Sequence, residues 1–289
     1  MKIPTLTICT LVLALCLVTS FALAQDARGH LVIIGGGGRT TEMMKRFVAL
    51  AGGGEKANIA IIPLASGDPR EAYEEAAVEF KNLGARQVSC LLFSKAEAAA
   101  DSTCEKFNGV TGVFFTGGDQ VRVTRVIVGT PVHRRLLQLY RDGAVMGGTS
   151  AGAAIMSKVM ITGDELINKD STNMFKSIQK GNVETVEGLG FLDQVVVDQH
   201  FVKRKRLNRL ISVILEHPTL PGIGIDESTA VVVSPGGGVE VMGEGAVVVL
   251  DARHAGAIHT DTRGNLVGQN IVMHIYSAGD KFDLKTVQP

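Results

Sequence analysis

Short apolar runs alternate with amphipathic segments along the first half of the chain. The runs are continuously apolar, which is typical of strands buried on both faces of a parallel sheet. They occupy residues 30–34, 58–62, 87–93, 112–116 and 144–146. The segments between them have helical character at about 41–51, 69–83, 95–107 and 131–140. This alternation predicts an α/β protein with a doubly wound, mainly parallel sheet.

The pattern changes after Lys158. Residues 160–190 are polar and weakly periodic, and we expect a long excursion from the sheet there. A further strand ends at Asp198, and a strong helical segment follows it at 201–217. The close spacing and glycine turns of the later apolar runs predict C-terminal antiparallel hairpins, at 222–225, 230–234, 239–242 and 246–250. We find no linker between residues 25 and 289, so one domain is expected.

The first residues resemble an export signal. Lys2 supplies a positive start, residues 3–18 are largely apolar, and Ala22-Leu23-Ala24 fits a cleavage site. We predict that residues 1–24 are a signal peptide and that the mature chain is exported, to the periplasm or the medium, without a membrane anchor. The alternative interpretation is a membrane-tethering helix.

Composition narrows the possible functions. Apolar residues make up 45% of the chain, and 34 glycines suit a folded α/β protein with many tight turns. The formal net charge of zero gives no global reason to expect a nucleic-acid partner. After signal removal Cys90 and Cys104 remain, and either a disulfide or two free thiols is possible. Their spacing is not that of metal ligands, and no metal is expected.

Four glycines, Gly35 to Gly38, follow the first strand, where a dinucleotide-binding loop would lie. The fingerprint is incomplete because residue 40 is Thr, and no strand-end carboxylate follows about twenty residues later. A tight strand-to-helix turn is therefore the preferred interpretation. We expect no organic cofactor.

Residues 145–154 read Val-Met-Gly-Gly-Thr-Ser-Ala-Gly-Ala-Ala, a strand that runs into small residues around one hydroxyl. The segment matches the G-x-S-x-G nucleophile elbow, in which Ser150 sits on a strand-to-helix turn with its oxygen exposed. The amide of Ala151 would face a developing oxyanion. Glycine and serine also end ordinary strands, so the motif needs a partner base to indicate catalysis.

His200 is the candidate base. Of the seven histidines it alone follows an apolar strand directly, which places it at the same carboxyl edge of the sheet as Ser150. Asp226 and Glu227 follow another short strand and point to opposite faces if the chain is extended. Asp198 shares a side of its strand with His200 and competes for the role of orienting carboxylate. The residues alone leave this choice open.

A basic cluster follows His200, made up of Lys203, Arg204, Lys205, Arg206 and Arg209. Cations at a helix N-terminus oppose the helix dipole at a cost of roughly a few tenths of a kcal/mol each, so local stability does not explain them. Guanidinium groups bind carboxylates through two hydrogen bonds, which favours recognition of an anion. A solvated basic face is the alternative. No aromatic residues interleave with the cluster, which argues against nucleic acid.

Four motifs, in this order, resemble those of the cyanophycinase family, serine peptidases that also include aspartyl dipeptidase. They are Phe115-Thr-Gly-Gly-Asp-Gln120, Gly147-Gly-Thr-Ser-Ala-Gly152, Asp198-Gln-His-Phe201 with Arg204, Arg206 and Arg209, and Gly224-Ile-Asp-Glu-Ser-Thr-Ala230. The likeness extends over about residues 30 to 285. It implies a flavodoxin-like fold related to class I glutamine amidotransferases, and it suggests a homodimer.

The resemblance also implies roles for single residues. Ser150 corresponds to the nucleophile, His200 to the general base and Glu227 to the orienting acid. The backbone around Gly118 and Asp119, with the amide of Ala151, corresponds to the oxyanion hole. The substrate pocket corresponds to Gln120, Asp198, Gln199, Arg204, Arg206 and Arg209.

The family degrades cyanophycin, a poly-aspartate chain with arginine on each β-carboxylate, and releases β-aspartyl-arginine dipeptides from the chain end. We therefore expect an exported serine exopeptidase in which arginines hold substrate carboxylates and Asp198 holds the substrate guanidinium. The signal peptide departs from the family pattern, because enzymes of storage granules act inside cells. An aspartyl or isoaspartyl dipeptidase and a non-catalytic exported binding protein on the same fold are the alternatives. A glutamine amidotransferase would carry cysteine at position 150.

Overall fold

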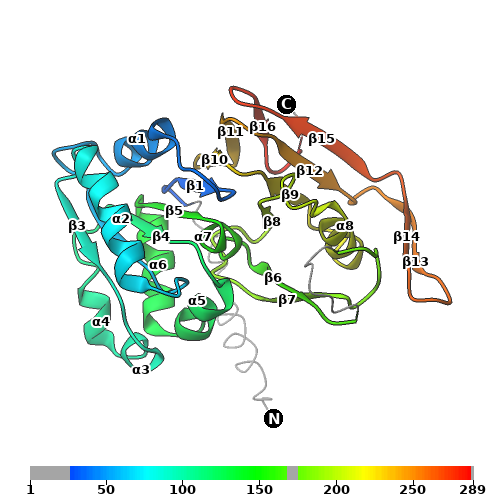
Figure 1. The fold of residues 1–289 in the computed structure, drawn as a ribbon, viewed down its shortest axis with the longest axis horizontal. Helices are drawn as coiled ribbons and strands as arrows, with labels where there is room; N and C mark the ends of the chain where they lie inside the picture. Colours follow the sequence, from blue (N-terminus) through cyan, green and yellow to red (C-terminus); the bar gives the residue numbers. More distant parts are fainter. Residues whose placement is uncertain (1–26, 168–174, 288–289) are drawn as a thin grey trace, which may run out of the picture.

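The computed structural model of the chain describes residues 27–167 and 175–287. The predicted signal peptide, with Cys9 and Cys16, lies outside the described residues. An eight-stranded sheet organises the fold in the order β16-β11-β10-β1-β5-β4-β2-β3 (Figure 1). Its strands are β1 (Leu31–Ile34), β2 (Asn58–Ile62), β3 (Gln87–Cys90), β4 (Gly112–Phe115), β5 (Val145–Thr149), β10 (Thr229–Val233), β11 (Gly238–Gly243) and β16 (Lys281–Asp283).

Strands β1 to β5 pair in parallel. Strands β10, β11 and β16 extend the sheet from β1 in antiparallel pairs. The prediction of a mixed α/β fold with a parallel-dominated central sheet is confirmed. The continuous apolar runs are explained by two-sided burial, because successive strand residues enter different cores. Leu31 and Ile33 pack in one hydrophobic core, and Val32 and Ile34 pack in the other.

Helices cover both faces of the main sheet. The side chains of α1 (Thr41–Leu50) and α2 (Pro69–Asn82) pack in the second core, and those of α5 (Gln120–Ile127) and α6 (Pro131–Asp142) pack in the first. Local sequence fixes where the helices begin. Asp68 caps α2 through the amides of Arg70 and Glu71, and Thr130 caps α6 through the amide of His133.

Two helical segments differ from the predicted ones. Residues 95–107 form two short helices, α3 (Lys95–Ala98) and α4 (Asp101–Glu105), because the backbone is extended at Ala100. The segment after His200 turns through residues 201–206, and α8 (Leu207–Glu216) starts only at Leu207. Positive φ angles at His200 and Lys205 accompany this turn. Most of the basic cluster therefore precedes the helix.

A second sheet lies beside the first. It has the order β15-β12-β9-β8 and contains β8 (Val196–Gln199), β9 (Gly222–Ile225), β12 (Val247–Asp251) and β15 (Val272–Tyr276). The strand that ends near Asp198 thus does not extend the main sheet, because β10 already occupies the edge of β1. One face of the second sheet joins the first core through Val197 and Ile223, and the other packs on α8.

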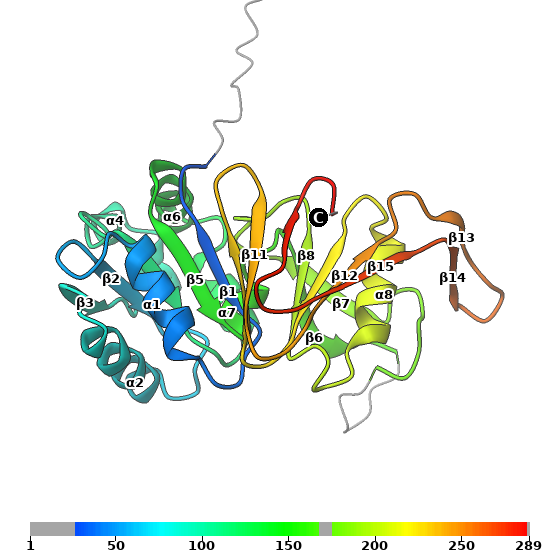
Figure 2. The same cartoon turned by 90° about the horizontal axis from the view of Figure 1, so that it is seen from above.

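The polar excursion contains strands that we did not predict. β6 (Val159–Glu165) and β7 (Val183–Glu187) pair antiparallel, and residues 168–174 between them are outside the described part of the chain. A further antiparallel pair, β13 (Gly256–Thr260) and β14 (Leu266–Gln269), lies at the end of the molecule opposite α2 (Figure 2).

Both Cys90 and Cys104 are free thiols. None of the described helices has the length and apolar character needed to span a membrane.

Three fully buried rings, Phe47, Phe80 and Phe114, join α1, α2 and β4, with centroids 5.3 to 5.6 Å apart. We predict that Phe47→Ala lowers the free energy of unfolding by about 3–5 kcal/mol, because it leaves a cavity among these rings. Chemical denaturation followed by circular dichroism measures the change. Val78→Ala, at a side chain that is 58% exposed, is the control and should change it by less than about 0.5 kcal/mol. Equal effects of the two substitutions would contradict the prediction.

Candidate active site

Ser150 lies on a sharp turn between β5 and the short helix α7 (Ala151–Ala154). Its backbone has φ 54° and ψ −109°, a strained conformation for a residue other than glycine and the one expected of a nucleophile elbow. The turn is tight enough to require a residue without a side chain at Gly152, where a Cβ would lie 2.4 Å from the carbonyl oxygen of Phe115. The sequence motif therefore folds as its spacing predicts.

Ser150, His200 and Glu227 form a chain of hydrogen bonds. The distance from Ser150 Oγ to His200 Nε2 is 2.9 Å, and His200 Nδ1 lies 2.6 Å from Glu227 Oε1. An ionised carboxylate only accepts hydrogen bonds, so Nδ1 carries the proton and Nε2 is left to accept from the serine hydroxyl. This is the geometry of a nucleophile, a base and an orienting acid.

Asp226, another acid considered for the orienting role, has a different hydrogen-bond partner. Asp226 accepts a hydrogen bond from the backbone amide of Lys203 at 2.9 Å and so fixes the turn after His200. Glu227, the next residue, meets the imidazole. The alternation of side chains along the extended chain after β9 separates the two acids, as the sequence indicated.

The glycine-rich loop after β1 supports His200. The amide of His200 donates to the carbonyl of Gly35 at 2.7 Å, and a Cβ on Gly36 would lie 2.3 Å from the imidazole ring. Gly36 also has a φ of 106°. The loop that resembles a dinucleotide fingerprint is therefore a close-packed support for the histidine.

Electrostatics favours a neutral imidazole. Burial lowers the pKa of His200 below its usual value, the hydrogen bond to Glu227 acts in the opposite direction, and the nearby Arg204 and Arg206 lower the pKa further. The hydrogen bond from His200 lowers the pKa of Glu227, which stays ionised. Near neutral pH the site thus holds an imidazole that can accept a proton and a carboxylate that orients it.

The predicted oxyanion residues differ in the hydrogen bonds that their backbone amides make. Ala151 is the first residue of α7, so its amide has no acceptor within the helix, and within the described residues neither it nor the Gly118 amide donates to a protein acceptor. The amide of Asp119 already donates to the carbonyl of Ala65 at 2.9 Å, and its side chain caps α5. Gly118 and Ala151 are therefore the available donors, and Asp119 is not one.

A cavity of about 410 Å³ lies beside Ser150. Arg206 lines it with a side chain that is 11% exposed, and its Nη1 donates to the backbone oxygen of Gln199 at 2.7 Å and to the side-chain oxygen at 2.8 Å. Burial, together with Arg209, lowers the pKa of Arg206 to about 10. Arg204 also lines the cavity and is half exposed.

Asp198 and Arg209 bind each other. The Nε of Arg209 donates to Asp198 Oδ2 at 2.7 Å, a second bond joins Nη2 to Oδ1, and Phe175 lies 5.3 Å from the guanidinium. The Asp198 side chain is fully buried and does not line the cavity, whereas Arg209 does. Asp198 is therefore not placed to bind a substrate guanidinium, as we had expected it to do. Asp198 instead positions Arg209 and, at 3.9 Å, Arg206.

Gln120 has a structural contact that the sequence did not reveal. Its Nε2 donates to the backbone carbonyls of Ile161 and Thr162, at 3.0 and 2.5 Å, and so joins α5 to β6.

The sequence gave no signal for several other residues of the cavity wall, because most of them lie in the excursion that we expected to be irregular. They are Arg125, Thr162, Gly163, Asp164 and Glu184.

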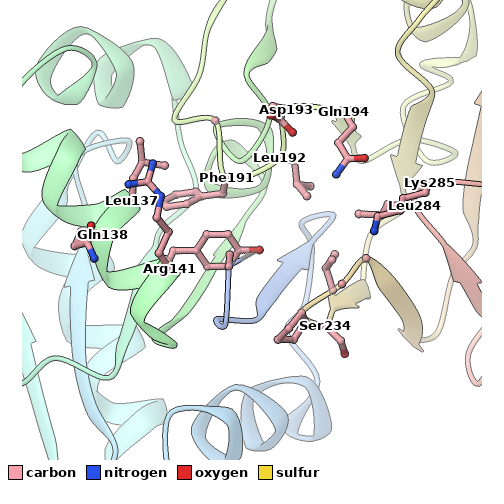
Figure 3. A pocket seen from close by; sticks show the side chains of 17 residues that line it. Leu137, Gln138, Arg141, Phe191, Leu192, Asp193, Gln194, Ser234, Leu284 and Lys285 are labelled. Atoms are coloured by element: carbon pink, nitrogen blue, oxygen red, sulfur yellow. The ribbon is translucent and has the colours of Figure 1, made fainter. Parts of the chain in front are cut away.

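A larger cavity, about 640 Å³, lies away from this site (Figure 3). Tyr140, Arg141, Phe191, Ser234 and Lys285 are among its lining residues. Ser234 follows β10, whose last residue pairs with the first residue of β1, so this cavity lies at the amino ends of the parallel strands. Ligands of such sheets bind at the carboxyl ends, where Ser150 lies, and the smaller cavity is thus the candidate site.

We predict that the pKa of His200, measured by NMR titration of its ring, lies below that of a free histidine and rises in Arg204→Ala. The substitution removes a positive charge that disfavours the imidazolium, so the charged form becomes easier to make. Arg125→Ala, which removes another arginine of the same cavity, is the control and should leave the pKa of His200 unchanged. An unchanged or lower pKa in Arg204→Ala would contradict the prediction.

The chain is similar in sequence to known peptidases. The model of "Peptidase family S51" matches residues 31–241. A cyanophycinase of Nostoc sp. is 36% identical over 277 residues, with 92% of this chain and 89% of that protein covered. A cyanophycinase of Geminocystis herdmanii is 34% identical over 276 residues, with 92% and 97% covered.

The fold is similar to that of solved peptidases. The crystal structure of a peptidase from an acI-B1 Actinobacterium superposes with a TM-score of 0.65 at 21% identity, covering 90% of this chain and 98% of that one. A putative peptidase E of Listeria monocytogenes gives a TM-score of 0.51 at 16% identity, covering 75% and 99%. The resemblance read from the four motifs is confirmed: the chain belongs to peptidase family S51 and is a serine-type peptidase.

Proposed function

We propose that this chain is an exported serine exopeptidase that hydrolyses cyanophycin to β-aspartyl-arginine dipeptides. The observation that carries the proposal is the hydrogen-bonded chain of Ser150, His200 and Glu227 beside a cavity lined by three arginines of one cluster. Relatives named cyanophycinase, 34–36% identical over about nine-tenths of the chain, support it.

In the proposed mechanism, Ser150 Oγ attacks the scissile carbonyl carbon while His200 Nε2 takes the hydroxyl proton. The amides of Gly118 and Ala151 donate to the oxygen that becomes negative. His200 returns its proton to the leaving nitrogen as the C–N bond breaks, and an acyl-enzyme remains on Ser150. A water molecule then attacks the ester carbonyl as the same imidazole takes its proton. The imidazolium returns that proton to Ser150 Oγ as the acyl C–O bond breaks, which frees the acyl product and restores the serine. Throughout, Glu227 accepts the hydrogen bond from the Nδ1–H of His200 and keeps the ring oriented.

Charge in the cavity fits a substrate rich in carboxylates. Arg206 and Arg209 share the single carboxylate of Asp198, which leaves one positive charge in excess in a poorly solvated region. A guanidinium that lacks a full counter-charge is a strong ligand for a carboxylate. We propose that an aspartate carboxylate of the polymer binds there, with Arg204 and Gln199 at the same wall.

We further propose that residues 1–24 direct export and are removed, so that the enzyme digests polymer released by other cells. The fold proposed for residues 25–289 is a single flavodoxin-like domain with C-terminal β-hairpins, and the chain is proposed to form a homodimer. The proposed chemistry uses side chains, backbone amides and one water molecule, and it includes no metal or organic cofactor.

We predict that purified protein releases β-aspartyl-arginine from cyanophycin and that Ser150→Ala lowers the rate by at least about 10⁴-fold, because no other group replaces the nucleophile. Mass spectrometry of the products measures both rates. Circular dichroism serves as the control for folding of the variant. Isoaspartyl dipeptides are tested in parallel. Cleavage of these dipeptides without cleavage of cyanophycin would show that the substrate is a dipeptide and not the polymer. Full activity of Ser150→Ala would contradict the assigned nucleophile.

We predict that Arg206→Ala lowers kcat/KM for cyanophycin by about 10- to 100-fold and changes that for a small neutral ester much less. The polymer carries a carboxylate that the Arg206 guanidinium would bind, whereas the neutral ester carries none. Lys203→Ala is the matched control, because Lys203 belongs to the same basic cluster and does not line the cavity. Equal losses on polymer and ester would show that Arg206 only maintains the shape of the site.

A further inference from the structure

The β6–β7 pair forms a part of the cavity wall that has an unusual register. Ile161 pairs with Thr185 and Glu165 with Val183, so three residues of β6 lie opposite a single residue of β7, Glu184. Thr162, Gly163 and Asp164 make up this bulge, and they line the cavity together with Glu184 and Ser150. Bulges re-aim side chains and are common next to active sites.

Hydrogen bonds hold the bulge in one conformation. Gln120 donates to the carbonyls of Ile161 and Thr162, and the Thr162 hydroxyl donates to the backbone oxygen of Glu184 at 3.3 Å. The same hydroxyl accepts from the amide of Asp164 at 3.2 Å. The bulge is thus fixed to α5, which begins at Gln120, and to the neighbouring strand. A side chain carried on it has a defined position relative to Ser150.

Glu184 and Asp164 differ from the other acids of the site in having no ionic partner among residues 27–167 and 175–287. Asp198 is paired with Arg209, and Glu227 is paired with His200. Within the described residues, neither Glu184 nor Asp164 forms an ion pair, and neither carboxylate accepts a hydrogen bond. Arg125 lines the cavity as well and is ion-paired to neither acid. Glu184 is half-buried, whereas Asp164 is exposed.

The cavity thus has cationic residues from the cluster after His200 and carboxylates from the β6–β7 pair. A ligand that satisfies both must carry an anionic and a cationic group on one short unit. We propose that Glu184, assisted by Asp164, is a specificity-determining residue that binds the guanidinium of the substrate. This inference rests on the proposed function and gives Glu184 the role that the sequence had suggested for Asp198. A carboxylate can accept two hydrogen bonds from a guanidinium in one plane, which selects this cation over a neutral group of the same shape.

Two ligands that differ only in charge test the proposal. One is a short oligomer of β-aspartyl-arginine, and the other carries citrulline, the neutral analogue, in place of arginine. We expect Ser150→Ala protein to bind the arginine oligomer about 10- to 100-fold more tightly in isothermal titration. Adding Glu184→Gln should remove most of that preference and leave binding of the citrulline oligomer unchanged. Glu187→Gln, an exposed acid of the same strand outside the cavity, should keep the preference.

Hydrolysis of the same oligomers by protein with Ser150 intact separates the two proposals. Cleavage of the arginine oligomer with a preference that Glu184→Gln does not reduce would overturn the role of Glu184 and keep the proposed function. A Glu184-dependent preference in binding, without any cleavage, would keep the cation site and overturn the proposed hydrolysis. Equal weakening of both oligomers by Glu184→Gln would show that this residue only supports the bulge, and absence of both binding and cleavage would overturn both proposals.

Discussion

The hydrogen bond between Ser150 and His200 joins two sheets. Ser150 follows β5 in the main sheet, whereas His200 and Glu227 follow β8 and β9 in the second. The bond therefore depends on how closely the two sheets dock. The loop after β1 fixes that distance, since Gly35 accepts from the amide of His200 and Gly36 accepts from that of Ser228. Strain is stored on both sides of the bond, because Ser150 and His200 both have positive φ.

The docking also explains why the first core is so large. It contains side chains of the main sheet, of α5 to α7, and of one face of the second sheet. Apolar burial there supplies the free energy that holds the strained turns and the partly desolvated imidazole in place. Ser150 and His200 are thus positioned by the same packed interior, although 50 residues separate them in the chain.

The parallel strands and the turn at Ser150 could be predicted from the sequence because both depend on local patterns. Residues 58–62 were delimited as strand exactly as observed, since Pro63 ends the apolar run. The second sheet could not be predicted, because the sequences of β8 and β9 resemble main-sheet strands, and only the pairing of β10 with β1 excludes them from that edge. The pairing of Asp198 with Arg209 could not be predicted from the sequence either. A carboxylate beside a basic cluster fits a ligand contact and an internal ion pair equally well, and only burial distinguishes them.

The internal pair has a consequence for how the cavity distinguishes charges. Asp198 is surrounded by guanidinium groups and excluded from the cavity, so it acts by setting how much positive charge Arg206 and Arg209 present. The carboxylates of Asp164 and Glu184 come from a different part of the chain, the β6–β7 pair, in which Asp164 lies in the bulge and Glu184 lies opposite it. In the proposed function, hydrolysis and charge recognition therefore depend on different elements of the fold. In the proposed function, the two sheets and the turn at Ser150 position the attacking groups, whereas the turn before α8 and the β6–β7 pair bring charged side chains to the cavity.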